Sequence, residues 1–205
     1  MAEPTDAGPA VLRRSPLTHL RDRMRAATVT GERGVSLEEW PFVTMVSLRV
    51  DPASEAAGRI GSALGATLPG HCGATTRSGP HTTLWLGPDE WLVLSQSEGP
   101  ELVAELLDAL AGAPGSVVDV SANRTTLELS GPSARAVLEK GCALDLHPRS
   151  FGPGRALSTQ VGPVPVVLWQ TGETAYRLLP RSSFADYLAR WLIDAMSEFQ
   201  GAEVP

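Results

Sequence analysis

The histidines and cysteines of this sequence are its best candidates for metal ligands, but their spacing argues against a metal centre. His71 and Cys72 are adjacent, and adjacent side chains on an extended loop point to opposite sides. A structural zinc site needs a tetrahedral set of ligands, usually in pairs with a few residues between them. The sequence therefore predicts no metal-binding residue. The residues considered are His19, His71, His81, His147, Cys72 and Cys142.

Nucleophilic and cofactor chemistry have equally weak signals. The sequence has no Gly-x-Ser-x-Gly motif and no Gly-x-Gly-x-x-Gly dinucleotide motif. Cys72 lies in a glycine-rich stretch where we expect an exposed loop, and Cys142 follows a helical stretch where we expect burial, so both are predicted to be structural thiols. Gly152-Pro153-Gly154 leads into a strand and its proline lacks an N–H donor, which indicates a turn and not a phosphate loop. We predict no catalytic and no cofactor-binding residue.

The tryptophans fall where core packing is the default expectation. Trp85, Trp91, Trp169 and Trp191 lie in predicted strands or a helix, and Trp40 precedes Pro41 at the entry to a strand. Tryptophan is enriched among the residues that dominate protein–protein binding energy. Any tryptophan that is exposed is therefore a candidate anchor for a partner.

The elements that position these residues are clearest between Val117 and Leu168. Val117–Ser121 and Thr125–Leu129 predict two strands, the second with the alternation of a half-buried strand. A helix follows Ser130-Gly131-Pro132, where proline suits a first turn, and it ends at Gly141. Its apolar stripe consists of Ala134, Val137 and Leu138.

The rest of the chain predicts a similar succession of elements. Phe42–Val50 is strand-like, a long exposed loop is expected over Gly65–Pro80, and Ser182 or Ser183 is predicted to cap the last helix. The remaining predictions are helices over 53–64 and 100–111, a hairpin of 81–86 with 90–95, and a hairpin of 164–169 with 175–179.

This order predicts an α+β protein with two ferredoxin-like lobes, each a mostly antiparallel sheet with helices on one face. We predict lobes at 40–114 and 115–199, a flexible arm at 1–39 and a frayed tail at 200–205. Leu17, Leu20 and Met24 have helical spacing within the arm, which is also rich in arginine. A solvated arm and an arm that orders on a partner both fit this pattern.

Composition narrows the functional classes. The 205 residues carry a net charge of −6, which argues against general nucleic-acid binding. Lys140 is the single lysine among 17 basic residues, a bias that suggests a GC-rich genome. No apolar run is long enough for a transmembrane helix and the first residues lack the apolar core of a secretory signal, so we expect a cytoplasmic protein with reduced thiols.

The central stretch resembles the glycine-cleavage T-protein family of folate-binding aminomethyltransferases. The similarity is carried by Asp119-Val-Ser121, by Leu127-x-Leu129-x-Gly131-Pro132-x-Ala134-x-x-x-Leu138 and by Pro153–Leu157. That family has an Asp pair after a glycine-rich turn, whereas this chain has Gly162-Pro163-Val164-Pro165-Val166-Val167, without a carboxylate. Arg14–Leu17 and Trp85–Leu92 add a resemblance to a related family, the gamma subunits of heterotetrameric sarcosine oxidase.

The second resemblance implies a non-catalytic subunit on a T-protein-like scaffold. Its partners would be alpha, beta and delta subunits, and the complex would oxidise sarcosine to glycine, giving hydrogen peroxide and, with tetrahydrofolate, methylenetetrahydrofolate. FAD, FMN, NAD, tetrahydrofolate and zinc would then lie in the other subunits. The alternatives are a free-standing folate-binding protein or aminomethyltransferase-like module, and a tRNA-modification or repair-type folate protein. Asn123-Arg124 would lie near the folate cavity of the T-protein relatives, or simply in a surface turn.

Overall fold

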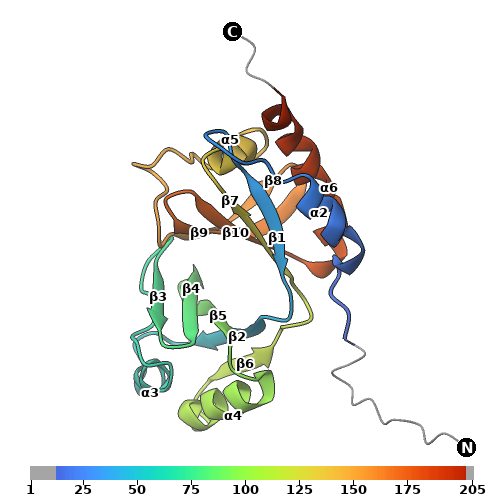
Figure 1. The fold of residues 1–205 in the computed structure, drawn as a ribbon. Helices are drawn as coiled ribbons and strands as arrows, with labels where there is room; N and C mark the ends of the chain where they lie inside the picture. Colours follow the sequence, from blue (N-terminus) through green and yellow to red (C-terminus); the bar gives the residue numbers. More distant parts are fainter. Residues whose placement is uncertain (1–12, 202–205) are drawn as a thin grey trace, which may run out of the picture.

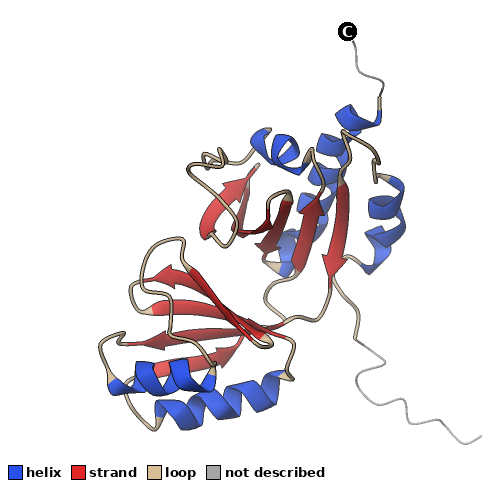
Figure 2. Ribbon diagram, turned by 60° about the vertical axis from the view of Figure 1, so that its left-hand side comes forward, coloured by secondary structure: helices blue, strands red, loops and turns tan. Residues whose placement is uncertain are grey.

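Two antiparallel sheets form the framework of the chain in a computed structural model that describes residues 13–201 (Figure 1). Each sheet carries its helices on the outer face, and the two inner faces turn toward each other (Figure 2). This arrangement confirms the predicted α+β class with two antiparallel lobes. No helix in residues 13–201 is long and apolar enough to cross a membrane.

The first sheet has the strand order β3-β4-β5-β2-β6. Its strands β2, β4, β5 and β6, with helices α3 and α4, follow the ferredoxin-like β-α-β-β-α-β order, and β3 adds an edge strand. Ser54 caps α3 by accepting a hydrogen bond from the Ala57 amide. The bounds are β2 Thr44–Val50, α3 Glu55–Ala63, β3 Thr75–Ser78, β4 His81–Gly87, β5 Glu90–Ser95, α4 Gly99–Leu110 and β6 Gly115–Asp119.

The second sheet has the order β1-β7-β10-β9-β8 and the same topology, but its fourth strand comes from the beginning of the chain. In the first sheet, β6 follows α4 directly; here β1 occupies the equivalent edge and precedes all other strands. The bounds are η1 Thr18–Leu20, α2 Arg21–Ala26, β1 Ser36–Trp40, β7 Thr126–Ser130, α5 Ala134–Glu139, β8 Ala156–Val161, β9 Val164–Gly172, β10 Ala175–Pro180, α6 Ser182–Met196 and η2 Ser197–Gln200.

Three apolar clusters hold these layers together. One lies between the first sheet and α3 and α4, and another lies between the second sheet and α2, α5 and α6. The third joins the inner faces of the two sheets and contains Met45, Leu84, Leu92, Leu94, Ala156, Val167, Trp169 and Leu179. The chain crosses between the lobes twice, at residues 41–43 and 120–125.

Residues 13–39 differ from the predicted flexible arm. Leu17, Leu20 and Met24 are buried in the core of the second lobe, and β1 pairs with β7 along its whole length. Burying a leucine side chain contributes about 1.5–3 kcal/mol, which explains why this segment packs on its own chain. Residues 1–12 and 202–205, which complete the predicted arm and tail, lie outside the described residues.

Three further predictions differ from the structure. Residues 115–119 form β6, which pairs with β2, so the first lobe extends past the predicted boundary at 114. The predicted loop 65–80 contains β3, paired with β4. The predicted cap at Ser182 or Ser183 is wrong, because α6 begins at Ser182 and the Ser182 hydroxyl donates to the Ala122 carbonyl instead.

Candidate functional site

A cavity of about 750 Å³ between the inner faces of the two sheets is the candidate site. Its size lies within the range of ligand-binding pockets, roughly 300–1,000 Å³. Both sheets and the crossing at 41–43 contribute to its lining, so it exists only because the two lobes face each other. Its lining includes charged and aromatic side chains, of which Arg13, Trp40, Phe42, Arg77, Trp169 and Arg177 are the largest.

Arg177 occupies the wall formed by the second sheet. Its register on β10 places it opposite Glu128 on β7 and Trp169 on β9. The guanidinium lies 3.9 Å from the ring centre of Trp40 and 5.3 Å from that of Trp169, within cation–π range. Its Nε donates to Glu128 Oε2 at 2.9 Å. This contact orients the guanidinium and leaves its two terminal nitrogens without a hydrogen bond to any described residue.

Two buried hydrogen-bond donors lie in the same wall. Thr126 Oγ1 and Trp169 Nε1 have no hydrogen-bond partner among the described residues, although both side chains belong to cavity-lining residues. A buried polar group without a partner costs about 1–3 kcal/mol. The wall therefore retains unused capacity for polar contacts next to Arg177.

The mouth of the cavity presents two exposed aromatic rings. Trp40 is 38% exposed and Phe42 is 49% exposed. Phe42 has φ +61°, a left-handed backbone that costs a non-glycine residue roughly 1–2 kcal/mol. The Arg13 guanidinium lies 4.7 Å from the Phe42 ring centre. The crossing between the lobes thus holds an aromatic ring toward solvent in a strained conformation.

Asp119 is a carboxylate of the cavity that is held by hydrogen bonds within the chain. It accepts hydrogen bonds from the backbone amide of Ser121 at 2.8 Å and from the Ser121 hydroxyl. It also lies beside the first residue of α4, since a Cβ built on Gly99 would lie 3.0 Å from Asp119 Oδ2. A carboxylate at a helix N-terminus is stabilised by the helix dipole. The negative charge of Asp119 is consequently stabilised by groups of the same chain.

A serine–histidine pair lies beside the cavity but is not arranged for catalysis. Ser95 Oγ and His81 Nδ1 are 2.9 Å apart, because residues 81 and 95 are cross-strand partners. Ser95 is 4% exposed, so a substrate cannot reach its hydroxyl, and the Ser97 amide donates to the same oxygen. Within residues 13–201 no carboxylate is hydrogen-bonded to the His81 ring. A catalytic triad needs an accessible nucleophile and an oriented base.

The other residues considered from the sequence do not gather at a site. Residues 13–201 contain no group of three or more histidine, cysteine or acidic side chains that would hold a metal. Cys72 is exposed and Cys142 is half-buried, and burial raises the pKa of the Cys142 thiol, which lowers its reactivity. Gly152–Gly154 forms a turn in which the Arg155 amide donates to the Gly152 carbonyl.

The two segments singled out by the resemblance to the T-protein family, Asn123-Arg124 and Val166-Val167, contribute no polar group to the lining of the cavity. Arg124 Nη1 donates to the Leu179 carbonyl at 2.8 Å and fastens the crossing at 120–125 to the end of β10, while the Asn123 carbonyl accepts from the Ser182 amide at the start of α6. Val166 packs under the helices and Val167 packs between the sheets. This segment presents apolar side chains where the T-protein pattern has carboxylates.

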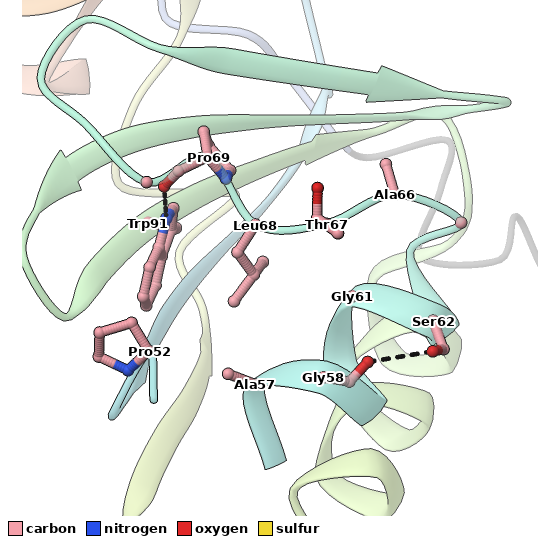
Figure 3. Close-up of a pocket in the computed structure, with 12 residues that line it drawn as sticks. Pro52, Ala57, Gly58, Gly61, Ser62, Ala66, Thr67, Leu68, Pro69 and Trp91 are labelled. Atoms are coloured by element: carbon pink, nitrogen blue, oxygen red, sulfur yellow. Dashed lines mark hydrogen bonds between the residues drawn. The ribbon is translucent and has the colours of Figure 1, made fainter. Parts of the chain in front are cut away.

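A second cavity of about 560 Å³ lies beside α3 (Figure 3). Small residues such as Gly58, Gly61 and Ser62 leave space along the helix, and Trp91 closes one side by donating its Nε1 proton to the Pro69 carbonyl at 2.8 Å. None of the described residues that line it is charged. It offers apolar contact but no group for acid–base chemistry, so the cavity between the sheets remains the candidate site.

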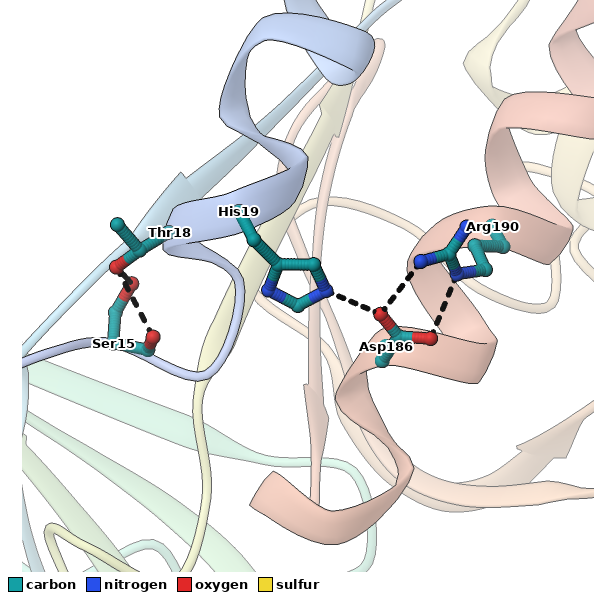
Figure 4. Close-up of polar contacts among 5 residues, drawn as sticks. All are labelled: Ser15, Thr18, His19, Asp186 and Arg190. Carbon is teal, nitrogen blue, oxygen red and sulfur yellow. Dashed lines mark hydrogen bonds and ion pairs between the residues drawn. The ribbon is translucent and has the colours of Figure 1, made fainter.

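An ion cluster joins the N-terminal segment to the last helix (Figure 4). Asp186 lies 2.6 Å from His19 Nε2 and accepts from Arg190 Nε at 2.8 Å. The hydrogen bonds from Arg190 and His19 lower the pKa of the Asp186 carboxyl. All three side chains are substantially exposed, which suits a surface tether between η1 and α6 better than a reaction centre.

Comparisons with known proteins converge on one family. Residues 48–198 match the model of the "Sarcosine oxidase, gamma subunit family". The chain is 48% identical over 205 residues to the sarcosine oxidase subunit gamma of Corynebacterium sp. strain U-96, covering 100% of both chains. It is 46% identical over 194 residues to the corresponding subunit of an Arthrobacter species, covering 94% of both.

Solved structures agree with these matches. A chain of the heterotetrameric sarcosine oxidase from Corynebacterium sp. U-96, in complex with pyrrole 2-carboxylate, superposes with a TM-score of 0.90 at 48% identity, covering 95% of this chain and 100% of that one. The glycine cleavage system aminomethyltransferase T from Bartonella henselae gives a TM-score of 0.66 at 16% identity, covering 89% of this chain and 57% of that one. The second likeness concerns the fold alone and confirms the T-protein-like scaffold.

Proposed function

Since this chain belongs to the sarcosine oxidase gamma subunit family, we propose that it is the gamma subunit of a heterotetrameric sarcosine oxidase. The observation that carries the proposal is the 48% identity over the full length to a gamma subunit of such an enzyme. The match spans both lobes and both crossings between them, so it concerns the whole architecture and not one shared motif.

We infer that the subunit acts by supporting its partners and not by catalysing a step. The side chains of the candidate cavity support this view, because the serine of the pair formed by Ser95 and His81 is buried and its hydroxyl already accepts from the Ser97 amide. The raised pKa of the half-buried Cys142 thiol also argues against a nucleophilic role.

The proposed complex oxidises sarcosine to glycine, forming hydrogen peroxide and, with tetrahydrofolate, methylenetetrahydrofolate. Alpha, beta and delta subunits are the proposed partners, with FAD, FMN, NAD, tetrahydrofolate and zinc held by them. We propose a cytoplasmic complex. The T-protein-like scaffold of this chain links it structurally to folate proteins, while Val166 and Val167 replace the carboxylates expected for one-carbon transfer.

Affinity purification from the host grown on sarcosine tests this function. The tagged chain is expected to recover a yellow complex with flavin absorbance and sarcosine-dependent peroxide formation. A colourless monomer from cells that contain the active oxidase would contradict the proposal. In that case, micromolar affinity of the isolated chain for tetrahydrofolate, measured by calorimetry, would support the alternative of a free-standing folate-binding module.

A further inference from the structure

We propose that the cavity between the sheets is a docking site for an acidic, extended segment of a partner subunit. The inference rests on the proposed function, because it requires a partner chain. The carboxylates of this segment would meet the arginines of the cavity. An apolar side chain of the segment would pack against the aromatic residues at the mouth.

The mouth has the composition of a protein-binding hot spot. Trp40 and Phe42 are large aromatic residues that remain 38% and 49% exposed. The Arg177 guanidinium lies over the Trp40 ring, and the Arg13 guanidinium lies over the Phe42 ring. Tryptophan and arginine dominate such hot spots. The left-handed backbone of Phe42 is a strained conformation in an exposed crossing, and strain of this kind persists at functional positions where a residue must be presented in one direction.

The arginines supply the charge that the partner must match. Arg13 and Arg77 are exposed and form no ion pair with any residue in 13–201, and the terminal nitrogens of Arg177 form no hydrogen bond there. The carboxylates of the lining are Asp119 and Glu98, both beside the first residue of α4. Asp119 accepts two hydrogen bonds from Ser121 and lies at the N-terminus of α4, where the helix dipole stabilises negative charge. Arg13 and Arg77 have no ion-pair partner among the described residues, so they are the side chains that the carboxylates of an acidic segment would meet.

The shape of the cavity favours an extended segment over a small molecule. Its lining reaches from Arg77 on β3 to Asp119 on β6, which are opposite edges of the first sheet. Four steps between neighbouring strands span roughly 19 Å, the length of about six residues of extended chain. A small molecule inside the cavity would leave the exposed Phe42 ring at the mouth uncovered, whereas a chain entering there would bury it.

Assembly of the co-expressed four-subunit oxidase tests the proposal. Phe42→Gly removes the ring and relieves the positive φ, so the free chain should keep its stability while its apparent affinity for the other subunits falls at least tenfold. Arg13→Glu combined with Arg77→Glu should give a similar loss by reversing the charge. The matched controls are Tyr187→Ala, an exposed aromatic on α6, and Arg149→Glu, an exposed arginine outside the cavity. Both controls should assemble as the parent chain does.

A photo-crosslinking amino acid at position 42 identifies the occupant. Crosslinking in the assembled complex to a partner peptide rich in aspartate and glutamate supports the inference. Normal assembly of both cavity variants, an equal loss from the controls, or a crosslinked peptide without acidic residues overturns it. These comparisons require that the parent chain assembles with the other subunits. A parent chain that does not assemble contradicts the proposed function, so failure of the function and failure of the docking proposal are distinguishable.

Discussion

Two residues among those described adopt left-handed backbone conformations without being glycine, and they have different roles. Phe42 lies at the mouth of the cavity, whereas Ala111 ends α4 with φ +50° and ψ +39° and is exposed. Helices commonly end in this conformation, with glycine strongly favoured because it lacks a Cβ atom. At Ala111 the chain therefore carries avoidable strain.

Ala111→Gly is expected to raise the free energy of unfolding by about 0.5 kcal/mol. Relief of left-handed strain, roughly 1–2 kcal/mol, exceeds the greater chain entropy of glycine in the unfolded state, roughly 0.5–1 kcal/mol. The matched control is Ala104→Gly at an exposed position inside the same helix, which should lower the free energy of unfolding by about 1 kcal/mol. Urea denaturation measures both changes. The same sign for the two substitutions would refute the assignment of strain to Ala111.

Asp186→Asn is expected to destabilise the chain at neutral pH but not in acid. The pKa of Asp186 is lowered by Arg190 and His19, so its stabilising contribution is present above the unfolded pKa near 3.9 and is lost as pH falls through the lower folded pKa. Because the pair is exposed and screened, the cost at pH ~7 is at most about 1 kcal/mol. Urea unfolding at pH ~7 and pH ~2.5 measures it, with Asp194→Asn on the same helix as the control. A difference that persists unchanged in acid would count against this account.

At the scale of elements, local periodicity predicted most of the structure. The amphipathic stripe of α4, the hairpin of β4 and β5, and the alternation of β7 are strong signals confined to a few residues, and each prediction is confirmed. The pairing of β1 with β7 joins residues about 90 positions apart, which no local pattern encodes. β3 escaped prediction because its sequence, TTRS, is polar and shorter than the usual strand.

The candidate site was harder to predict, since two lobes form it. Alternation along β10 shows that Arg177 faces away from Tyr176 and Leu178. From the sequence alone that face is expected to be exposed to solvent, whereas in the structure the first sheet lies opposite it across the cavity. Trp40 was predicted only as an anchor if exposed, and the structure shows that it is 38% exposed. Phe42 is predicted to begin the strand Phe42–Val50, but β2 begins at Thr44 and Phe42 has a positive φ, which the residue type does not reveal when the residue is not glycine.

Leu20→Ala tests whether the N-terminal segment is an integral part of the second lobe. Leu20 is 1% exposed in that core, so its truncation should lower the free energy of unfolding by about 2–5 kcal/mol. Leu107→Ala is the control, since Leu107 is 47% exposed and its truncation should change stability by at most about 0.5 kcal/mol. Tryptophan fluorescence in urea reports both. Equal, small effects would mean that the segment is peripheral, as a flexible arm would be.

At the scale of the whole molecule, the two lobes share one topology but not one chain order. The fourth strand of the first sheet follows α4, while the fourth strand of the second sheet is β1, and α2 packs beside it before the first lobe begins. The first lobe is consequently inserted into the second. The inter-sheet cluster and the two crossings then couple them, so the cavity depends on both lobes being folded.

This insertion predicts which fragments fold. Residues 115–205 contain everything that a division at residue 114 assigns to the second lobe, yet they lack β1 and the buried Leu17, Leu20 and Met24. We expect this fragment to be unfolded or molten, with poor dispersion in amide NMR spectra. Residues 115–205 followed by a flexible linker and residues 13–40 restore the strand and the core, and should show cooperative thermal unfolding. Both fragments expose the same inter-sheet face, so the comparison isolates β1 and α2. A cooperatively folded 115–205 fragment would show that the second lobe is complete without the N-terminal segment, and the insertion would then be a matter of chain order alone.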